Sequence, residues 1–167
     1  MRLTLLGILL GGMLFAAACG GDDEKTGTTT TTTRSTSAAS GSRGAAQQIN
    51  VTLQEYSIIP EKTSARVGKI TFNIENKGPK EAHEMLVFKT DTPLDKLPTQ
   101  SDGALDEEAP ELEPIDEISE INPAQSKSLT VDLEAGRYIL VSNVGEETGG
   151  QAVRDFQQGM VTEFKVE

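Results

Sequence analysis

The chain has 167 residues, a formal net charge of -11 and a single cysteine, Cys19. The excess of acidic groups argues against nucleic acid and anionic lipid surfaces as binding partners, because both would repel the chain. Since Cys19 lies close to the N-terminus, the rest of the chain has no disulfide, no thiolate nucleophile and no cysteine-based metal site.

The first 18 residues have the layout of a secretory signal peptide: Arg2 precedes an apolar run that ends in small residues directly before Cys19. That ending resembles a bacterial lipobox. The resemblance implies cleavage before Cys19, attachment of lipid to it, and anchoring to the outer face of a bacterial membrane, at the cell surface or in the periplasm. The alternative is an ordinary signal peptide that happens to contain a cysteine.

Residues 19–48 are rich in Thr, Ser, Gly and Ala, and they include an unbroken threonine run from Thr28 to Thr33. No apolar periodicity is present that could bury a core. The composition predicts a disordered tether between the lipidated Cys19 and one domain at 49–167.

The domain is predicted to be all-β. Apolar and polar residues alternate at 49–53, 70–74, 129–133 and 162–166, which is the pattern of a strand with one buried face. The continuous apolar run at 85–88 favours a strand buried on both faces, and 138–141 reads as a further strand. Short strands with polar turns between them predict an antiparallel Greek-key β-sandwich.

An insertion at about 91–120 interrupts this pattern with four prolines and many acidic residues. We expect a long excursion over one sheet edge, with one short strand or turn around 115–121. Its carboxylates are suitable Ca²⁺ ligands, but their spacing matches no EF-hand-like loop, so a solvated acidic surface is the favoured interpretation.

The last part of the domain places Ser142 after one strand and Met160 before the next, with Asp155 in the loop between them. These side chains are expected to converge at one end of a sheet. Together with His83, which precedes the buried strand at 85–88, this layout resembles the cupredoxins (plastocyanin and azurin-like proteins) over roughly residues 49–167. The resemblance implies that His83 matches the first histidine ligand of a type 1 copper site and Met160 the axial methionine, while Ser142 occupies the cysteine position and Asp155 the second histidine position.

A type 1 copper site requires a thiolate and two imidazoles, and a serine hydroxyl cannot replace the thiolate. The sequence therefore predicts a degenerate copper site in a non-redox binding or interaction module, with an unidentified protein partner and no cofactor. The alternative is a protein that binds or carries copper or zinc weakly through His83, Asp155 and Met160.

Structural roles compete with these ligand roles. His83 has the pattern of a structural histidine, Met160 that of a core residue, and Asp155 follows Arg154, with which it could form a surface ion pair. The favoured interpretation is that Ser142 and Asn143 hold the loop by hydrogen bonds. Ser142, His83 and Asp155 are also the residue types of a nucleophilic triad, but no nucleophile elbow or oxyanion-hole motif is present, so an enzyme is not expected.

Overall fold

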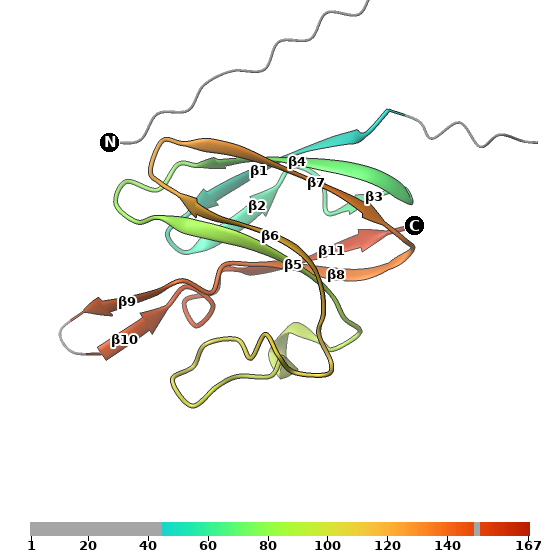
Figure 1. Cartoon of the computed structure of the whole chain (residues 1–167). Coiled ribbons are helices and arrows are strands. Elements are labelled where there is room, and N and C mark those ends of the chain that lie inside the picture. The colour runs from blue at the N-terminus through green and yellow to red at the C-terminus, as the bar shows by residue number, and fades with distance from the viewer. Residues whose placement is uncertain (1–44, 149–150) are drawn as a thin grey trace, which may run out of the picture. The chain divides into compact units, whose positions relative to one another are not determined.

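The computed structural model describes residues 45–148 and 151–167 (Figure 1). The predicted signal peptide, Cys19 and the predicted tether up to residue 44 lie outside the described residues. No helix in the described part of the chain has the length and apolar character needed to cross a membrane. Its elements are β1 (Gln47–Gln54), β2 (Ser57–Pro60), β3 (Ser64–Ala65), β4 (Gly68–Asn76), β5 (His83–Lys89), the 3-10 helix η1 (Leu94–Lys96), β6 (Glu113–Ile121), β7 (Ser126–Leu133), β8 (Gly136–Val141), β9 (Gly145–Thr148), β10 (Gln151–Arg154) and β11 (Val161–Val166).

The strands form two facing sheets and a separate hairpin. One sheet has the order β2-β1-β4-β7 and the other β3-β11-β8-β5-β6, while β9 and β10 pair only with each other. Most neighbours are antiparallel, but β1 runs parallel to β4 and β11 runs parallel to β3. The predicted β-sandwich is confirmed, and both of its sheets are mixed.

The main core lies between the sheets and follows the period-2 pattern of the strands. On β1, β4 and β7 every second side chain at 49–53, 70–74 and 129–133 is apolar and buried, and these side chains meet those of β5, β8 and β11. Phe72 of β4 and Phe164 of β11 cross the gap edge to face, with ring centroids 5.3 Å apart and planes at 78°. Such a pair adds about 0.5–1.5 kcal/mol to the free energy of unfolding beyond the area that it buries.

The insertion differs from the expected excursion over a sheet edge. It packs on the outer face of the five-stranded sheet, where three insertion leucines, Leu97, Leu105 and Leu112, join a second apolar cluster with residues of β5 and β8. This second layer explains the continuous apolar run on β5: Met85 and Val87 face the main core, while Leu86 and Phe88 face the insertion. The insertion then ends in β6, a full strand of nine residues where a short strand or turn was expected.

Candidate functional site

Three strand ends meet at one end of the five-stranded sheet. His83 is the first residue of β5, Ser142 follows β8 directly and Met160 precedes β11 directly. Because β8 pairs antiparallel with both β5 and β11, the start of β5, the end of β8 and the start of β11 lie at the same end. The sequence-predicted convergence of Ser142, Asp155 and Met160 is present.

Backbone hydrogen bonds hold this end together. The N–H of Ser142 donates to the carbonyl of Met160 at 3.0 Å, and the N–H of Met160 donates to the carbonyl of Asp155 at 3.0 Å. Asp155 opens a tight turn that ends at Gly159, whose φ of 104° lies in the left-handed region that favours glycine. The loop joining β8 to β11 therefore delivers these side chains from a fixed backbone.

The side chains of His83, Ser142 and Asp155 form one hydrogen-bonded network. Nδ1 of His83 lies 2.8 Å from Oδ2 of Asp155, and Oγ of Ser142 donates to the same Oδ2 at 2.6 Å. Oγ of Ser142 also accepts the N–H of Glu84 at 3.2 Å. His83 and Ser142 are 0% exposed and Asp155 is 4% exposed, so the carboxylate is the shared acceptor of a buried polar cluster.

The network has a clear electrostatic consequence for His83. Burial on its own would lower the pKa of His83, but the hydrogen bond and negative charge of Asp155, with further negative charge from Glu55 and Glu81, raise that pKa above its ordinary value. The neighbouring Glu84 has a raised pKa chiefly because it is buried. The imidazole and the carboxylate thus stabilise each other inside the fold.

The geometry does not match two alternative roles, a surface ion pair between Asp155 and Arg154 and a nucleophilic triad that includes Ser142. Arg154 pairs with Asp102 of the insertion, whereas Asp155 points inward, so the two neighbours do not form a surface ion pair with each other. In a nucleophilic triad the serine hydroxyl donates to the histidine. Here the hydroxyl of Ser142 donates to the carboxylate, and His83 binds that same oxygen.

Met160 takes part in the site through its backbone, and its side chain belongs to the main core cluster with 0% exposure. Nε2 of His83, by contrast, is buried without a hydrogen-bond partner among the described residues. The same part of the chain contains no group of three His, Cys, Asp or Glu side chains placed to hold a metal ion.

The loop before His83 is fixed by a buried amide and an acidic side chain. Asn76, which is 0% exposed, donates from Nδ2 to the carbonyls of Glu81 and Ile121, each at 2.8 Å, and its Oδ1 accepts the N–H of Gly78 at 2.8 Å. Oε1 of Glu55 accepts the N–H groups of two further loop residues, and a Cβ at Gly78 would come within 2.7 Å of that oxygen. Both contacts set the position from which β5 begins.

Asn143 makes a contact that sequence reasoning did not find. It was expected to hold its own loop, but its side chain binds the insertion. Oδ1 accepts the N–H of Leu105 at 2.8 Å, while Nδ2 donates to the carbonyl of Leu105 at 3.1 Å and to Oε1 of Glu107 at 2.7 Å. The residue type indicated a role in hydrogen bonding, since a buried amide needs both donors and acceptors. Its partners could not be found from the sequence because they lie 36 to 38 positions away.

Replacing Asn143 with alanine is expected to loosen the insertion over the sheet. The N–H and carbonyl of Leu105 would lose their partner while buried, which costs about 1–3 kcal/mol. Hydrogen exchange measured by NMR should show faster exchange at Leu105, with little change in the strands of the opposite sheet. Asn73→Ala, on the exposed face of that sheet, is the control. Unchanged exchange at Leu105 would show that Asn143 does not hold the insertion against the sheet.

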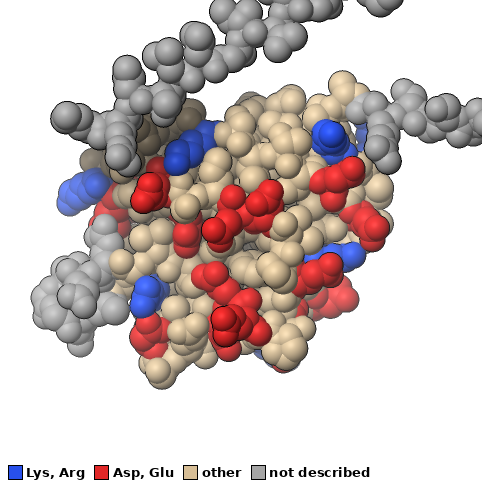
Figure 2. Space-filling view, viewed as in Figure 1, with Lys and Arg blue, Asp and Glu red and all other residues tan. Residues whose placement is uncertain are grey.

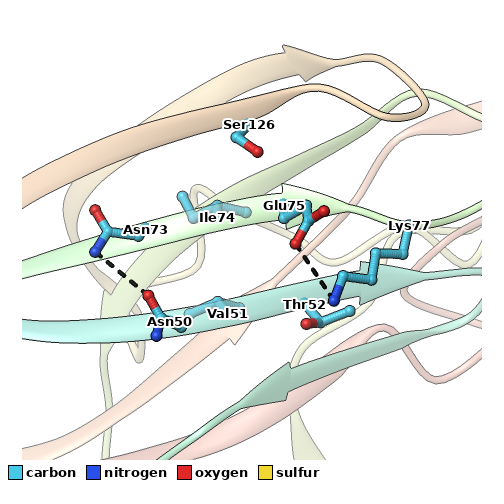
Figure 3. A pocket seen from close by; sticks show the side chains of 8 residues that line it. All are labelled: Asn50, Val51, Thr52, Asn73, Ile74, Glu75, Lys77 and Ser126. Atoms are coloured by element: carbon cyan, nitrogen blue, oxygen red, sulfur yellow. Dashed lines mark hydrogen bonds and ion pairs between the residues drawn. The ribbon is translucent and has the colours of Figure 1, made fainter.

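A second candidate site is a shallow hollow on the outer face of the four-stranded sheet (Figure 3). It has a volume of about 340 Å³ and is lined by residues of β1 and β4, by Lys77 after β4 and by Ser126, the first residue of β7. Its polar side chains bind one another: Asn73 donates to Asn50 at 3.4 Å, and Lys77 pairs with Glu75 at 3.3 Å. The two buried side-chain atoms that lack a partner in the described part of the chain, on His83 and Arg154, do not line this hollow.

The described domain is a two-sheet β-sandwich of the cupredoxin type, in which the loop between the last two strands of the second sheet and the start of β5 meet at one end. Comparison with solved structures supports this class. The chain is similar to the dithionite-reduced auracyanin of the photosynthetic bacterium Roseiflexus castenholzii, with a TM-score of 0.50 and 16% identity over 74% of this chain and 99% of that one.

Auracyanin A, a "blue" copper protein from the green thermophilic photosynthetic bacterium Chloroflexus aurantiacus, has a TM-score of 0.47 and 16% identity, covering 74% of this chain and 100% of its own. A rusticyanin variant has a TM-score of 0.48 and 11% identity, covering 74% of this chain and 79% of its own. Neither the protein-family models nor the curated proteins give a match to this sequence. The similarity to the Roseiflexus auracyanin, at a TM-score of 0.50 and 16% identity, shows the cupredoxin-like fold and no more than the fold.

Proposed function

We propose that this protein is a lipid-anchored, extracytoplasmic binding module with a cupredoxin-like fold and no type 1 copper site. Its anchor would be lipid on Cys19, and its folded domain would contact a protein partner without transferring electrons. The single observation that carries the proposal is the hydrogen-bonded network of His83, Ser142 and Asp155. These residues stand at three of the positions where the resemblance to cupredoxins places copper ligands.

The geometry of the network supports a site in which the side chains bind one another by hydrogen bonds in place of a metal ion. Two ligand atoms that share a tetrahedral Zn²⁺ at about 2.0–2.2 Å lie about 3.4 Å apart. Nδ1 of His83 and Oδ2 of Asp155 are 2.8 Å apart, and Ser142 already donates to that oxygen. A metal ion between them would have to separate both pairs, although each is buried and would then lose its partner.

The donor set supports the same conclusion on chemical grounds. Copper sites of the blue type combine a thiolate with two imidazoles and a weak axial methionine. Ser142 offers a neutral hydroxyl in place of the thiolate, and Asp155 offers a hard carboxylate in place of the second imidazole. Met160 still supplies a soft thioether, but this set of donors suits no single metal ion well.

One observation favours the second candidate function, weak copper or zinc binding. Nε2 of His83 is buried and lacks a partner among the described residues, and a buried unpaired nitrogen is a position where an ion or a water molecule can bind. In that case His83, with Asp155 or Met160, would carry or buffer the metal at the cell surface.

A metal titration distinguishes the two functions. The fragment beginning at Gly44, which contains every described strand, is titrated with Cu²⁺, with Zn²⁺ and anaerobically with Cu⁺, and followed by calorimetry and visible absorption. We expect no saturable binding at micromolar concentrations and no intense thiolate-to-copper band. Tight binding would contradict the proposal.

Two variants identify the ligands if a metal does bind. Met160→Leu removes the thioether while keeping most of the core volume, so the fold is retained. His83→Ala removes the imidazole, and its folding is checked by circular dichroism because it leaves Asp155 without one buried partner. Under the second function His83→Ala loses metal uptake, and Met160→Leu loses it where the thioether, rather than Asp155, is the second ligand.

A further inference from the structure

The strand β7 is an outer strand of the four-stranded sheet. It pairs with β4 on one side and has no neighbouring strand on the other side within the described part of the chain (Figure 1). Its eight residues are in unbroken antiparallel register with β4, from Ser126 opposite Glu75 to Leu133 opposite Gly68. A long, regular outer strand presents a row of unpaired N–H and C=O groups to which a further strand can pair.

The direction of the free backbone groups follows from the ladder between β4 and β7. The N–H of Asn76 donates to the carbonyl of Gln125 at 2.9 Å, which continues that ladder past the start of β7. Because hydrogen-bonded pairs alternate along an antiparallel ladder, every second residue after Gln125 directs its backbone groups toward β4. The residues between them direct their N–H and C=O away from the sheet: Ser126, Ser128, Thr130 and Asp132.

The other outer strands of the two sheets carry features that hinder such pairing. β2 has four residues and ends in Pro60, and β3 has two residues. β6 contains Pro114 and several carboxylates, and its pairing with β5 shifts register twice. β7 has no proline, no register shift and one residue of each charge, Lys127 and Asp132. Among the described residues it is therefore the outer strand of the two sheets that is left open to a further strand.

We propose that β7 pairs antiparallel with β7 of a second copy of this chain, so that the two four-stranded sheets become one sheet across a twofold axis. The axis would pass between the two Leu129 residues, which places Ser128 opposite the partner's Thr130. In this register all four outward residues of each copy form hydrogen-bonded pairs, with about eight backbone hydrogen bonds in total, two for each pair. A shift by two residues in either direction leaves fewer pairs. This inference goes beyond the proposed function and does not depend on it.

The sequence of β7 is suited to pair with itself. Its apolar side chains point toward the core, while Ser128 and Thr130 are exposed on the outer face. Two copies therefore place hydroxyls beside hydroxyls, as Thr71 and Thr130 already lie at 2.8 Å on that face. No like charges stand directly opposite each other, because Lys127 lies opposite the partner's Val131. The segment before residue 45 has no such alternation of polar and apolar residues, so it is the less suitable occupant.

Net charge opposes this contact at low salt. Each chain has a formal net charge of -11, and Figure 2, viewed as in Figure 1, shows acidic side chains gathered over the middle of the domain, where β6 and β7 run. Salt screens the repulsion, so association between copies should strengthen as salt rises. Binding of a basic segment of another protein to the same strand would instead weaken. A closed twofold contact should also stop at the dimer.

Sedimentation equilibrium of the chain from Gly20 onward tests the proposal, at about 50 mM and about 500 mM salt and at protein concentrations from about 10 µM to about 1 mM. We expect a monomer–dimer equilibrium that is about fivefold tighter or more at the higher salt concentration. A monomer under every condition, oligomers larger than the dimer, or association that weakens with salt would each overturn the proposal.

Three variants locate the contact. Ser128→Pro removes an outward N–H from each copy but no hydrogen bond to β4, so the monomer should keep its circular dichroism spectrum while dimerisation is lost. Ser126→Asp places a carboxylate opposite the partner's Asp132 on both sides of the axis and should weaken the dimer about tenfold. Gln54→Glu adds the same charge on β1, away from β7, and should weaken it less than about twofold.

A dimer that withstands Ser128→Pro, or equal weakening by the two acidic variants, would show that β7 is not the contact. If Ser128→Pro does not fold, the comparison of the two acidic variants decides. None of these results bears on the metal titration, which tests the proposed function separately.

Discussion

Replacement of Asp155 with alanine is expected to destabilise the domain more than any other single change at the site. The carboxylate accepts hydrogen bonds from both His83 and Ser142, and all three side chains are buried. Its removal leaves Nδ1 of His83 without a partner and the hydroxyl of Ser142 without its acceptor, so that Oγ keeps only the N–H of Glu84. Removing one member of a buried pair typically costs about 3–5 kcal/mol, which we expect here as the fall in the free energy of unfolding measured with urea.

Three further variants test whether this loss comes from the network. Ser142→Ala removes one donor to the carboxylate and the acceptor of the Glu84 N–H but leaves His83 paired with Asp155, so it should cost about 1–2 kcal/mol. Asp102→Ala removes an exposed carboxylate that pairs with Arg154 and accepts the N–H of Ala104, and it should lower the free energy of unfolding much less than Asp155→Ala does. Asp155→Asn keeps the shape and one acceptor, and we expect an intermediate loss.

The pH dependence of the Asp155→Asn difference provides an independent readout. A histidine whose pKa is raised in the fold contributes stability that is complete below its ordinary pKa and is lost as pH rises through the raised value. The wild type should therefore exceed Asp155→Asn by more at about pH 5.5 than at about pH 8.5. A difference that grows with pH would show that His83 and Asp155 do not act as a charged pair.

The fold was predictable from sequence because the sandwich buries one face of most strands. One-sided burial requires apolar residues at alternate positions, as at Ile49, Val51 and Leu53 of β1, and the same pattern occurs on β4, β7 and β11. The continuous apolar run on β5 was also interpreted correctly as burial on both faces. What the pattern did not show is the layer that covers the second face, since the insertion supplies it with leucines scattered among prolines and acidic residues.

Short strands were missed for a different reason. β2 and β3 have four and two residues, too few to show a period, and they are defined by pairing with β1 and β11. The β9–β10 hairpin was expected to be an irregular polar loop because its segment contains no alternating apolar residues. In such segments pairing with a neighbouring strand decides the structure more than local propensity does.

The location of the site residues at one end of a sheet could be predicted from the sequence, but their hydrogen-bond partners could not. The strand-loop-strand pattern was enough to predict that Ser142, Asp155 and Met160 meet at one end of a sheet, and the resemblance to cupredoxins added His83. Which atoms would pair depends on side-chain rotamers and on distances of a few tenths of an ångström. The sharing of one carboxylate oxygen by two donors, and the attachment of Asn143 to Leu105, required the structure.

Introducing the two ligand types that the resemblance to cupredoxins places at Ser142 and Asp155 is the most demanding test of how this site relates to copper. The double replacement Ser142→Cys with Asp155→His would place a thiolate and a second imidazole beside His83 and Met160, the donor set of blue copper sites. The backbone hydrogen bonds that join Ser142, Met160 and Asp155 do not involve the exchanged side chains, so the end of the sheet should keep its form.

We expect the double variant to bind Cu²⁺ with an intense visible band from the thiolate, while the wild type and each single variant show none. Absorption and electron paramagnetic resonance spectra of the copper-loaded proteins measure this directly, with Met160→Leu in the double-variant background as a test of the axial position. If the folded double variant binds copper without the intense band, His83 and Met160 are not placed as ligands. In that event the likeness to cupredoxins would be limited to the fold.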